Sequence, residues 1–328
     1  MLLPTQDIAG LCAHWHRIDE SLLSDTGVEL WLYCPTTTEP MISGNKWMKL
    51  QYHIKLIQQQ QYRGLVTFGG AFSNHLAASA AAAQLNGFDA TAYVRADVID
   101  RQNPTLQYCL TKGMTLIATD RQTYRQRQQP DFLKMLALRH PGCLIIPEGG
   151  SSELGARGVA GLNLTDTPAG PADVIATATA SGGTLAGLIA ASTQQSAVSS
   201  NSAKVLGLTV VNDLSLPEKV ANLLAEQAVD AACWRIVATA PDQRYAKCPA
   251  EHVNFCCEFT LKHNIAVEPV YTGRALFKLY KMIAAGEFAQ GSRISFFHTG
   301  GLQGLAGLYY RQLITQQQYQ ILSAAAVG

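Results

Sequence analysis

Short apolar runs alternate with helical segments along almost the whole chain. The runs are rich in branched and aromatic side chains, and they occur at 64–70, 91–94, 114–117, 143–147, 174–179, 205–210 and 293–297. The segments between them have the composition of helices, including an alanine-rich one at 76–85. Strands that are apolar on both faces and separated by helices are typical of parallel sheets covered on both sides. The pattern therefore predicts an α/β protein, and the break at 149–151 separates two sets of strands.

The composition indicates a large core and excludes several kinds of partner. Of the 328 residues, 48% are hydrophobic and 15% are charged, and the formal net charge is +1. These values do not fit a nucleic-acid-binding surface or an acidic partner. No window approaches the roughly 18 apolar residues of a membrane span, and the first ten residues lack the pattern of a signal peptide. The 8 cysteines include no C-x-x-C pair. We therefore expect a cytoplasmic protein with free thiols, no metal, and no nucleic-acid or membrane partner.

The segment 173–192 has the pattern of a phosphate-binding turn. Its apolar strand ends in Ser181-Gly182-Gly183-Thr184, and a helical pattern begins at 185. Such a turn directs unpaired backbone N–H groups and the positive end of the helix dipole to one point. The segment matches neither the dinucleotide fingerprint nor the Walker loop, and an ordinary strand-to-helix turn has a similar composition. On the residues alone, it predicts a phosphate site and leaves the ligand open.

Three other glycine-flanked clusters are far apart in the sequence but fit one cleft. In the first, Lys46 stands where a loop enters a helix. Spacing alone favours a surface cation, and the alternative is a buried amine able to form a Schiff base. In the second, Ser73 and Asn74 are either simple N-caps or donors for an anionic group. In the third, at 296–301, a strand ends in polar residues, where open α/β sheets bind ligands. For His298 we favour a hydrogen-bonded structural role over that of a catalytic base.

Six motifs occur in one order along most of the chain. They are GNKWMKL (44–50), TFGGAFSNH (67–75), IPEGGSSELGARG (146–158), ASGGTLAGL (180–188), EPVYTGRAL (268–276) and FHTGG (297–301). In this order they resemble the pyridoxal-phosphate enzymes of the tryptophan synthase β-like fold (fold type II). Within that fold, the chain resembles the family of D-cysteine desulfhydrase and 1-aminocyclopropane-1-carboxylate (ACC) deaminase.

The resemblance implies an architecture and a cofactor. It implies two open, twisted, parallel-sheet α/β domains with pyridoxal 5′-phosphate in the cleft between them. The smaller, inserted domain would span 44–157, and the larger, cofactor-binding domain would combine 1–43 with 158–328. A homodimer is also implied, and closure of the smaller domain would exclude water from the cleft.

The resemblance further implies which residues bind the cofactor. Lys46 would hold it covalently and, once freed by the substrate amine, would move the proton on the substrate's α-carbon. Asn74 would donate a hydrogen bond to the ring oxygen, and Thr299 would face the pyridine nitrogen. The phosphate would be bound by the turn formed by Ser181, Gly182, Gly183 and Thr184.

The substrate, by the same resemblance, is a small amino acid. Ser73, together with Asn74 and His75, would hold its carboxylate. Tyr271 and Tyr245 would lie over the substrate, near the reacting carbons. We therefore place Lys46, Ser73, Tyr271 and Tyr245 among the residues that take part in catalysis.

Two threonines favour one branch of the family. ACC deaminase-like sequences carry an acidic residue after the active-site tyrosine and a leucine in the later glycine motif, where this chain has Thr272 and Thr299. The chain is thus expected to be a β-eliminating lyase that converts D-cysteine, or a relative such as β-chloro-D-alanine, to pyruvate and ammonia with loss of the β-substituent. ACC deaminase, a non-catalytic cofactor-binding relative, and a serine or threonine dehydratase of the same fold are the alternatives.

Three segments differ from the family pattern. Arg244 and Ala246 flank Tyr245 where glycines are usual, Trp47-Met48 follows the lysine, and Ala71-Phe72 precedes Ser73. Bulky side chains beside a site for a small substrate are expected to change its specificity.

Overall fold

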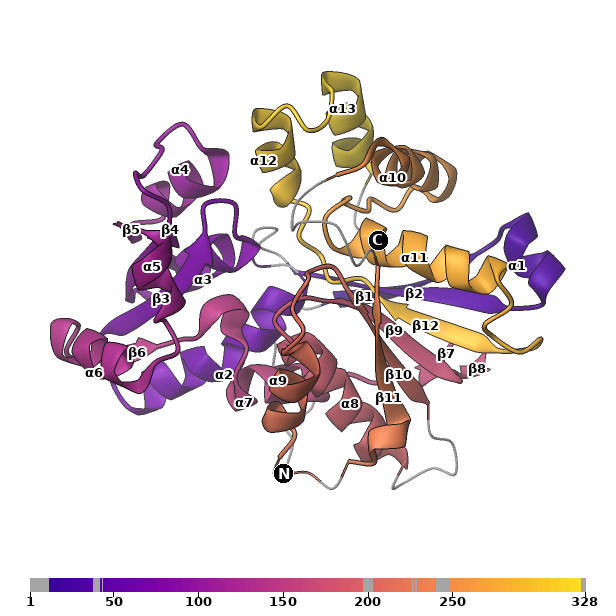
Figure 1. Cartoon of the computed structure of the whole chain (residues 1–328), viewed down its shortest axis with the longest axis horizontal. Coiled ribbons are helices and arrows are strands. Elements are labelled where there is room, and N and C mark those ends of the chain that lie inside the picture. The colour runs from indigo at the N-terminus through magenta and orange to yellow at the C-terminus, as the bar shows by residue number, and fades with distance from the viewer. Residues whose placement is uncertain are drawn as a thin grey trace.

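The fold consists of two α/β units that lie side by side, each built on its own sheet (Figure 1). This computed structural model describes residues 12–37, 42, 44–196, 203–225, 227, 229–239 and 248–325. Strands and helices alternate through most of this range, and the predicted α/β class is confirmed. No helix in the described ranges is long and apolar enough to cross a membrane.

The larger unit has a six-stranded sheet in the order β1-β2-β12-β9-β10-β11. Its strands are β1 (Cys12–Ile18), β2 (Glu29–Thr36), β9 (Val174–Thr179), β10 (Lys204–Thr209), β11 (Trp234–Ala238) and β12 (Arg293–Phe297). All neighbours are parallel except β1 and β2, which are antiparallel. The expected parallel-sheet architecture is therefore confirmed, with β1 as an antiparallel strand at one edge. The connection between β1 and β2 holds only the short helix α1 (Ser21–Thr26), whereas a parallel crossover needs a dozen or more residues.

The smaller unit has a four-stranded, fully parallel sheet in the order β5-β4-β3-β6. Its strands are β3 (Gly64–Gly70), β4 (Asp89–Arg95), β5 (Thr115–Thr119) and β6 (Cys143–Ile145). Its helices are α2 (Asn45–Gln59), α3 (Asn74–Asn86), α4 (Pro104–Thr111), α5 (Arg121–Arg125) and α6 (Pro130–Arg139). These four strands lie inside 44–157 and the six of the larger sheet lie outside it. The domain boundaries themselves stay a prediction.

The remaining helices cover the larger sheet and the junction between the units. They are η3 (Glu148–Gly150), α7 (Glu153–Ala160), α8 (Gly183–Ser196), α9 (Leu216–Leu223), η4 (Ala231–Cys233), α10 (Ala250–His263), α11 (Thr272–Ala284), α12 (Gly304–Tyr310) and α13 (Gln316–Ala324). A two-stranded ribbon, β7 (Asp166–Thr167) and β8 (Gly170–Pro171), completes the fold. Most apolar side chains form separate clusters on the two sheets, so each unit has its own core. One further cluster joins Met48 of α2 to the apolar side chains of the larger unit.

Helix α7 lies between α2 and α8 and contacts both at backbone distance. A Cβ atom added at Gly158 of α7 would collide with the carbonyl oxygen of Met48 in α2. A Cβ at Gly187 of α8 would lie 2.5 Å from the carbonyl oxygen of Ala156 in α7. Glycine at these two positions therefore permits α7 to cross α2 and α8 at close range. We call this arrangement the α7 contact, and it fixes the spacing between α2, which carries Lys46, and α8, which begins at the glycine turn.

Candidate active site

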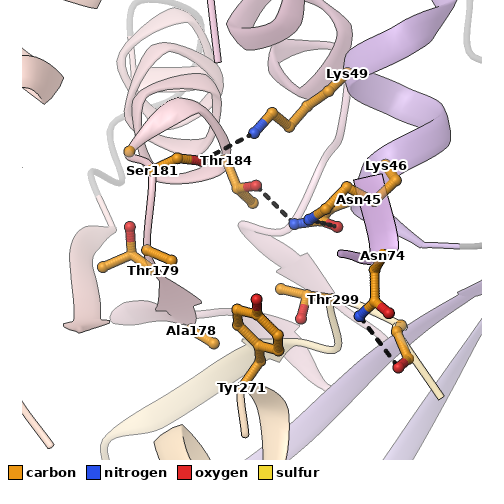
Figure 2. Close-up of a pocket in the computed structure, with 14 residues that line it drawn as sticks. Asn45, Lys46, Lys49, Asn74, Ala178, Thr179, Ser181, Thr184, Tyr271 and Thr299 are labelled. Atoms are coloured by element: carbon orange, nitrogen blue, oxygen red, sulfur yellow. Dashed lines mark hydrogen bonds between the residues drawn. The ribbon is translucent and has the colours of Figure 1, made fainter. Parts of the chain in front are cut away.

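One pocket collects residues from both units (Figure 2). It lies where α2, the turn after β9, the start of α11 and the turn after β12 meet. It is lined by Asn45, Lys46, Lys49, Asn74, Ala178, Thr179, Ala180, Ser181, Gly182, Thr184, Tyr271, Thr299, Gly300 and Gly301. The structure thus brings together seven of the residues named from the sequence, namely Lys46, Asn74, Ser181, Gly182, Thr184, Tyr271 and Thr299. Among the described residues that line it, none is acidic.

Lys46 is the second residue of α2 and points its amine into this pocket. Its Nζ donates to Asn45 Oδ1 at 2.9 Å, and Asn45 Nδ2 donates to Thr184 Oγ1 at 2.9 Å across the junction between the units (Figure 2). The turn before the helix is tight, because Gly44 has a φ of +76° and a Cβ there would collide with the carbonyl oxygen of Thr299. Burial lowers the pKa of Lys46 to about 8, against the opposing charge of Glu268. At this pKa, roughly a tenth of the amine is neutral, and nucleophilic, at pH 7, which is far more than for an exposed lysine.

The glycine turn has the geometry that the sequence predicts. Strand β9 ends at Thr179, Gly182 has a φ of +86°, and α8 begins at Gly183. The first N–H groups of α8, which have no acceptor within the helix, therefore open toward the pocket. A Cβ at Gly183 would lie 2.8 Å from Ser151 Oγ and 3.1 Å from Lys49 Cε, so only glycine fits there.

Lys49 is a site residue that the sequence reasoning missed. It is 1% exposed, and its Nζ donates to Ser151 Oγ at 2.7 Å and lies 3.5 Å from Ser181 Oγ (Figure 2). Burial and the neighbouring charge of Lys46 hold the pKa of Lys49 well below its usual value. Positions three apart share one face of a helix, so the lysine spacing in GNKWMKL was the signal that could have revealed it.

These groups fit a doubly charged phosphate. The amines of Lys46 and Lys49, the start of a helix and the Ser181 and Thr184 hydroxyls are donors or cations. The Thr179 hydroxyl is buried in the pocket wall and has no hydrogen-bond partner among the described residues. A bound anion would satisfy these donors and relieve the repulsion between Lys46 and Lys49.

Glu268 is a second residue that the sequence reasoning missed. It is 2% exposed, and its carboxylate accepts backbone N–H bonds from Val270, Tyr271 and Thr272 at 2.8–3.1 Å. Burial raises its pKa to about 8, although these donors and the charge of Lys46 oppose the increase. The carboxylate thereby fixes the turn that points Tyr271 into the pocket. An acidic residue four positions before a helix that begins with threonine was the available signal.

Thr272 and Thr299, the two threonines named in the sequence analysis, lie in direct contact. Thr272 Oγ1 and Thr299 Oγ1 are 3.0 Å apart, and both side chains are buried. Thr299 lines the pocket, whereas Thr272 does not line it and contacts the Thr299 hydroxyl instead. In such a pair, one hydroxyl donates to the other, and one proton remains for a further acceptor.

The remaining residues named from the sequence lie away from the pocket lining or outside the described residues. Ser73 is the N-cap of α3, accepting from Leu76 N at 3.4 Å, and it does not line the pocket. His75 also lies away from the pocket lining, because its buried ring bonds Thr67 Oγ1 through Nε2 at 2.8 Å. Tyr245 lies outside the described residues. For His298, the structural role is confirmed: Nδ1 accepts from Gly300 N at 3.0 Å, and Nε2 therefore donates to the Ala266 carbonyl oxygen at 2.8 Å.

Replacing Glu268 with glutamine is expected to destabilise this part of the site. The amide cannot accept all the N–H bonds that two carboxylate oxygens accept, and an unsatisfied buried polar group costs about 1–3 kcal/mol. Unfolding in urea should show a loss of free energy of this size, whereas Glu258→Gln, an exposed change on α10, should show none. Because the charge of Glu268 raises the pKa of Lys46, the variant should also show a lower pH midpoint for the reaction of Lys46 with an aldehyde reagent. An unchanged midpoint and an unchanged free energy of unfolding would contradict the assignment.

Comparison with known proteins agrees with this geometry. The family described as "Pyridoxal-phosphate dependent enzyme" matches residues 19–300. A protein of Pyrococcus abyssi, provisionally named a 1-aminocyclopropane-1-carboxylate deaminase, is 25% identical, covering 86% of this chain and 87% of its own length. The D-cysteine desulfhydrase of Klebsiella pneumoniae is 27% identical, with coverages of 86% and 90%. The mitochondrial "bifunctional D-cysteine desulfhydrase/1-aminocyclopropane-1-carboxylate deaminase" of Arabidopsis thaliana is also 27% identical, with coverages of 85% and 74%.

A solved structure shares the fold. The crystal structure described as that of an ACC deaminase homologue superposes with a TM-score of 0.75 at 23% identity, covering 92% of this chain and 94% of its own. At this identity, the likeness concerns the fold alone. Among the described residues, no group of three histidine, cysteine or acidic side chains is placed to hold a metal ion.

Proposed function

The chain belongs to the pyridoxal-phosphate-dependent enzymes, and from this premise we propose that it is a lyase that eliminates the β-substituent of a small D-amino acid. With D-cysteine and water, the products are pyruvate, hydrogen sulfide and ammonia. The observation that carries this choice is the buried Thr272–Thr299 hydroxyl pair at the pocket. ACC deaminase is the alternative, because the relatives carry both names at similar identity.

The pocket residues account for cofactor binding. Lys46 supplies the amine, while the turn at Ser181, Gly182, Gly183 and Thr184 and the buried ammonium of Lys49 would hold the phosphate. Asn74 would direct its amide to the ring oxygen, and Thr299 would face the pyridine nitrogen. When bound, pyridoxal phosphate accepts the electron pair that remains on the substrate's α-carbon after its proton is removed.

The chain's own groups then move protons and orient the substrate. Lys46 Nζ removes the proton from the α-carbon, which requires its neutral form and therefore suits a pKa of about 8. Ser73 caps α3 next to the pocket-lining Asn74, and from there it would hold the substrate carboxylate at the positive end of the helix. Tyr271 covers the reacting carbons and is held in place through the N–H bond to Glu268.

The threonine pair favours elimination over ring opening. Thr272 can donate to Thr299, which leaves the Thr299 proton for the pyridine nitrogen. A hydroxyl is a neutral partner, whereas a carboxylate at this place would keep that nitrogen protonated and make the ring a stronger electron acceptor. With this neutral partner, the Thr272–Thr299 pair would favour substrates that carry a good β-leaving group.

The function is tested by measuring pyruvate, sulfide and 2-oxobutanoate released by the cofactor-loaded protein. D-cysteine, L-cysteine and ACC are supplied side by side. Pyruvate and sulfide from D-cysteine alone are the expected result. 2-Oxobutanoate from ACC would show that the threonine pair does not decide the branch. Absence of product with all three substrates would overturn the proposal.

Replacing both threonines, by Thr272→Glu and Thr299→Leu, is expected to favour ring-opening deamination. The acidic side chain supplies the charged partner that the elimination site lacks, so kcat/KM for D-cysteine should fall at least ~10-fold, about 1.4 kcal/mol. Activity on ACC should rise relative to activity on D-cysteine. The matched control, Thr272→Val, removes the hydroxyl without adding a charge and should weaken elimination without creating ACC activity. An unchanged ratio between the two substrates in the double variant would contradict the role of the pair.

A further inference from the structure

Phe72, one of the residues that differ from the family pattern, packs across the junction between the two units. It lies in the loop between β3 and α3, directly before Ser73. A Cβ added at Gly307 of α12 would lie only 2.6 Å from Phe72 Cδ1, so the ring lies directly on the helix backbone. Arg311 directly follows α12, and its guanidinium lies 5.2 Å from the centroid of the Phe72 ring, within cation–π range.

The residues around Phe72 make further contacts with the same part of the larger unit. Asn74 Nδ2 donates to the carbonyl oxygen of Gly301 at 3.3 Å, and a Cβ at Gly304 would lie 3.3 Å from Asn74 Oδ1. Farther out, Tyr310 Oη donates to Asp100 Oδ2 at 2.7 Å, where Asp100 precedes α4. The segment 301–311 therefore contacts the smaller unit at the loop that carries Ser73 and at the approach to α4.

This junction is separate from the α7 contact. Figure 1 shows α12 facing α3 and α4 at the top of the molecule, while α2, α7 and α8 join the units lower down. The two units are thus connected at two places, one beside Lys46 and the glycine turn and the other beside Ser73. Only the second includes the loop that would hold the substrate carboxylate.

We propose that Phe72 is a positioning residue through which α12 sets the place of Ser73. The proposal rests on the proposed function, in which Ser73 holds the substrate carboxylate. When the smaller unit is closed on α12, Phe72 is held between Gly307 and Arg311, and the start of α3 faces the pocket. When this contact is lost, the loop before α3 is free to shift and the carboxylate subsite is incomplete, while Lys46, Lys49 and the glycine turn keep their places.

The test is a double-mutant cycle between Phe72 and Gly307 in the cofactor-loaded full chain. Gly307→Ala adds a methyl group where the Phe72 ring lies, and Phe72→Ala removes the ring. Amide hydrogen exchange is measured at Ser73, Leu76 and Ala77, whose N–H groups bond within this loop. The KM is measured with whichever of D-cysteine or ACC is turned over.

Each single variant is expected to speed exchange of these amides and to raise the KM by about tenfold, with a smaller effect on kcat and no change in cofactor absorption. The double variant should be no worse than Phe72→Ala, because the added methyl group then meets no ring. A Gly307→Ala effect that persists in the Phe72→Ala background would overturn the proposal, as would a Phe72→Ala variant with native exchange and native KM.

The exchange measurement separates this proposal from the proposed function. It is made without substrate, so it decides whether α12 holds the loop whatever the enzyme turns over. If exchange responds as expected but the KM does not, the contact is real and the role of Ser73 in substrate binding is wrong. Gly161→Ala, a change at an open position at the end of α7, is the control that should alter neither quantity.

Discussion

Replacing Lys46 with alanine is expected to lower turnover by at least ~10³-fold. Proton transfer by a positioned group contributes roughly 10²–10⁴-fold on its own, and the covalent hold on the cofactor is lost as well. The visible absorption of lysine-bound pyridoxal phosphate should disappear. The fold should survive, since Lys46 is half-buried and its amine bonds only its neighbour Asn45 among the described contacts.

Two further variants make this result specific. Lys134→Ala removes an exposed lysine on α6, which forms an exposed ion pair with Asp131. This change should leave absorption and turnover unchanged. Lys49→Ala should weaken cofactor binding but keep the absorption once the cofactor is in excess, because Lys49 would hold the phosphate without reacting. If Lys46→Ala kept its absorption and Lys49→Ala lost it, the covalent lysine would be Lys49 and the assignment of the pair would be reversed.

Replacing Gly158 with alanine is expected to destabilise the protein by about 3 kcal/mol, at the upper end of the cost of overpacking. The new methyl group would collide with the carbonyl oxygen of Met48, and a helix backbone cannot move aside as a flexible side chain can. Helix α2 would have to move away from α7, which would also move Lys46 and Lys49 relative to the glycine turn. Denaturant unfolding should show the loss of stability, and titration with pyridoxal phosphate should show a weaker affinity.

Gly161→Ala is the matched control for Gly158→Ala. Gly161 ends the same helix, has an ordinary helical φ of −76°, and has nothing within 4 Å of an added Cβ. This change should be neutral or slightly stabilising, since alanine reduces the freedom of the unfolded chain. Equal stabilities of the two variants would mean that α2 and α7 are not held at backbone distance.

The central strands were predictable because parallel strands buried on both faces are continuous apolar runs. β3, β9, β10 and β12 all occur where such runs stand. β1 was not predictable in this way, because it is an edge strand, Cys12–Ile18, whose side chains are mostly polar or half-exposed. Its antiparallel direction depends on the short connection to β2. That connection holds α1, which is too short to show a helical apolar repeat.

The candidate site was predictable where the backbone carries the chemistry. The glycine turn and Lys46 stand in motifs that a sequence displays directly, and the structure brings them together. Lys49, Glu268 and the Phe72–Gly307 contact could not be predicted with the same ease. Each depends on a partner far away in the sequence or on a side chain that becomes important only when it is buried.

The α7 contact has a mechanical consequence for how the enzyme would open. Three helices held backbone to backbone at Gly158 and Gly187 would serve as the axis for a rotation of the smaller unit. In such a rotation, displacement grows with distance from the axis. Lys46, Lys49 and the start of α8 stand beside this axis and would move least. The smaller unit would therefore open for an amino acid while the site for the cofactor hardly moves.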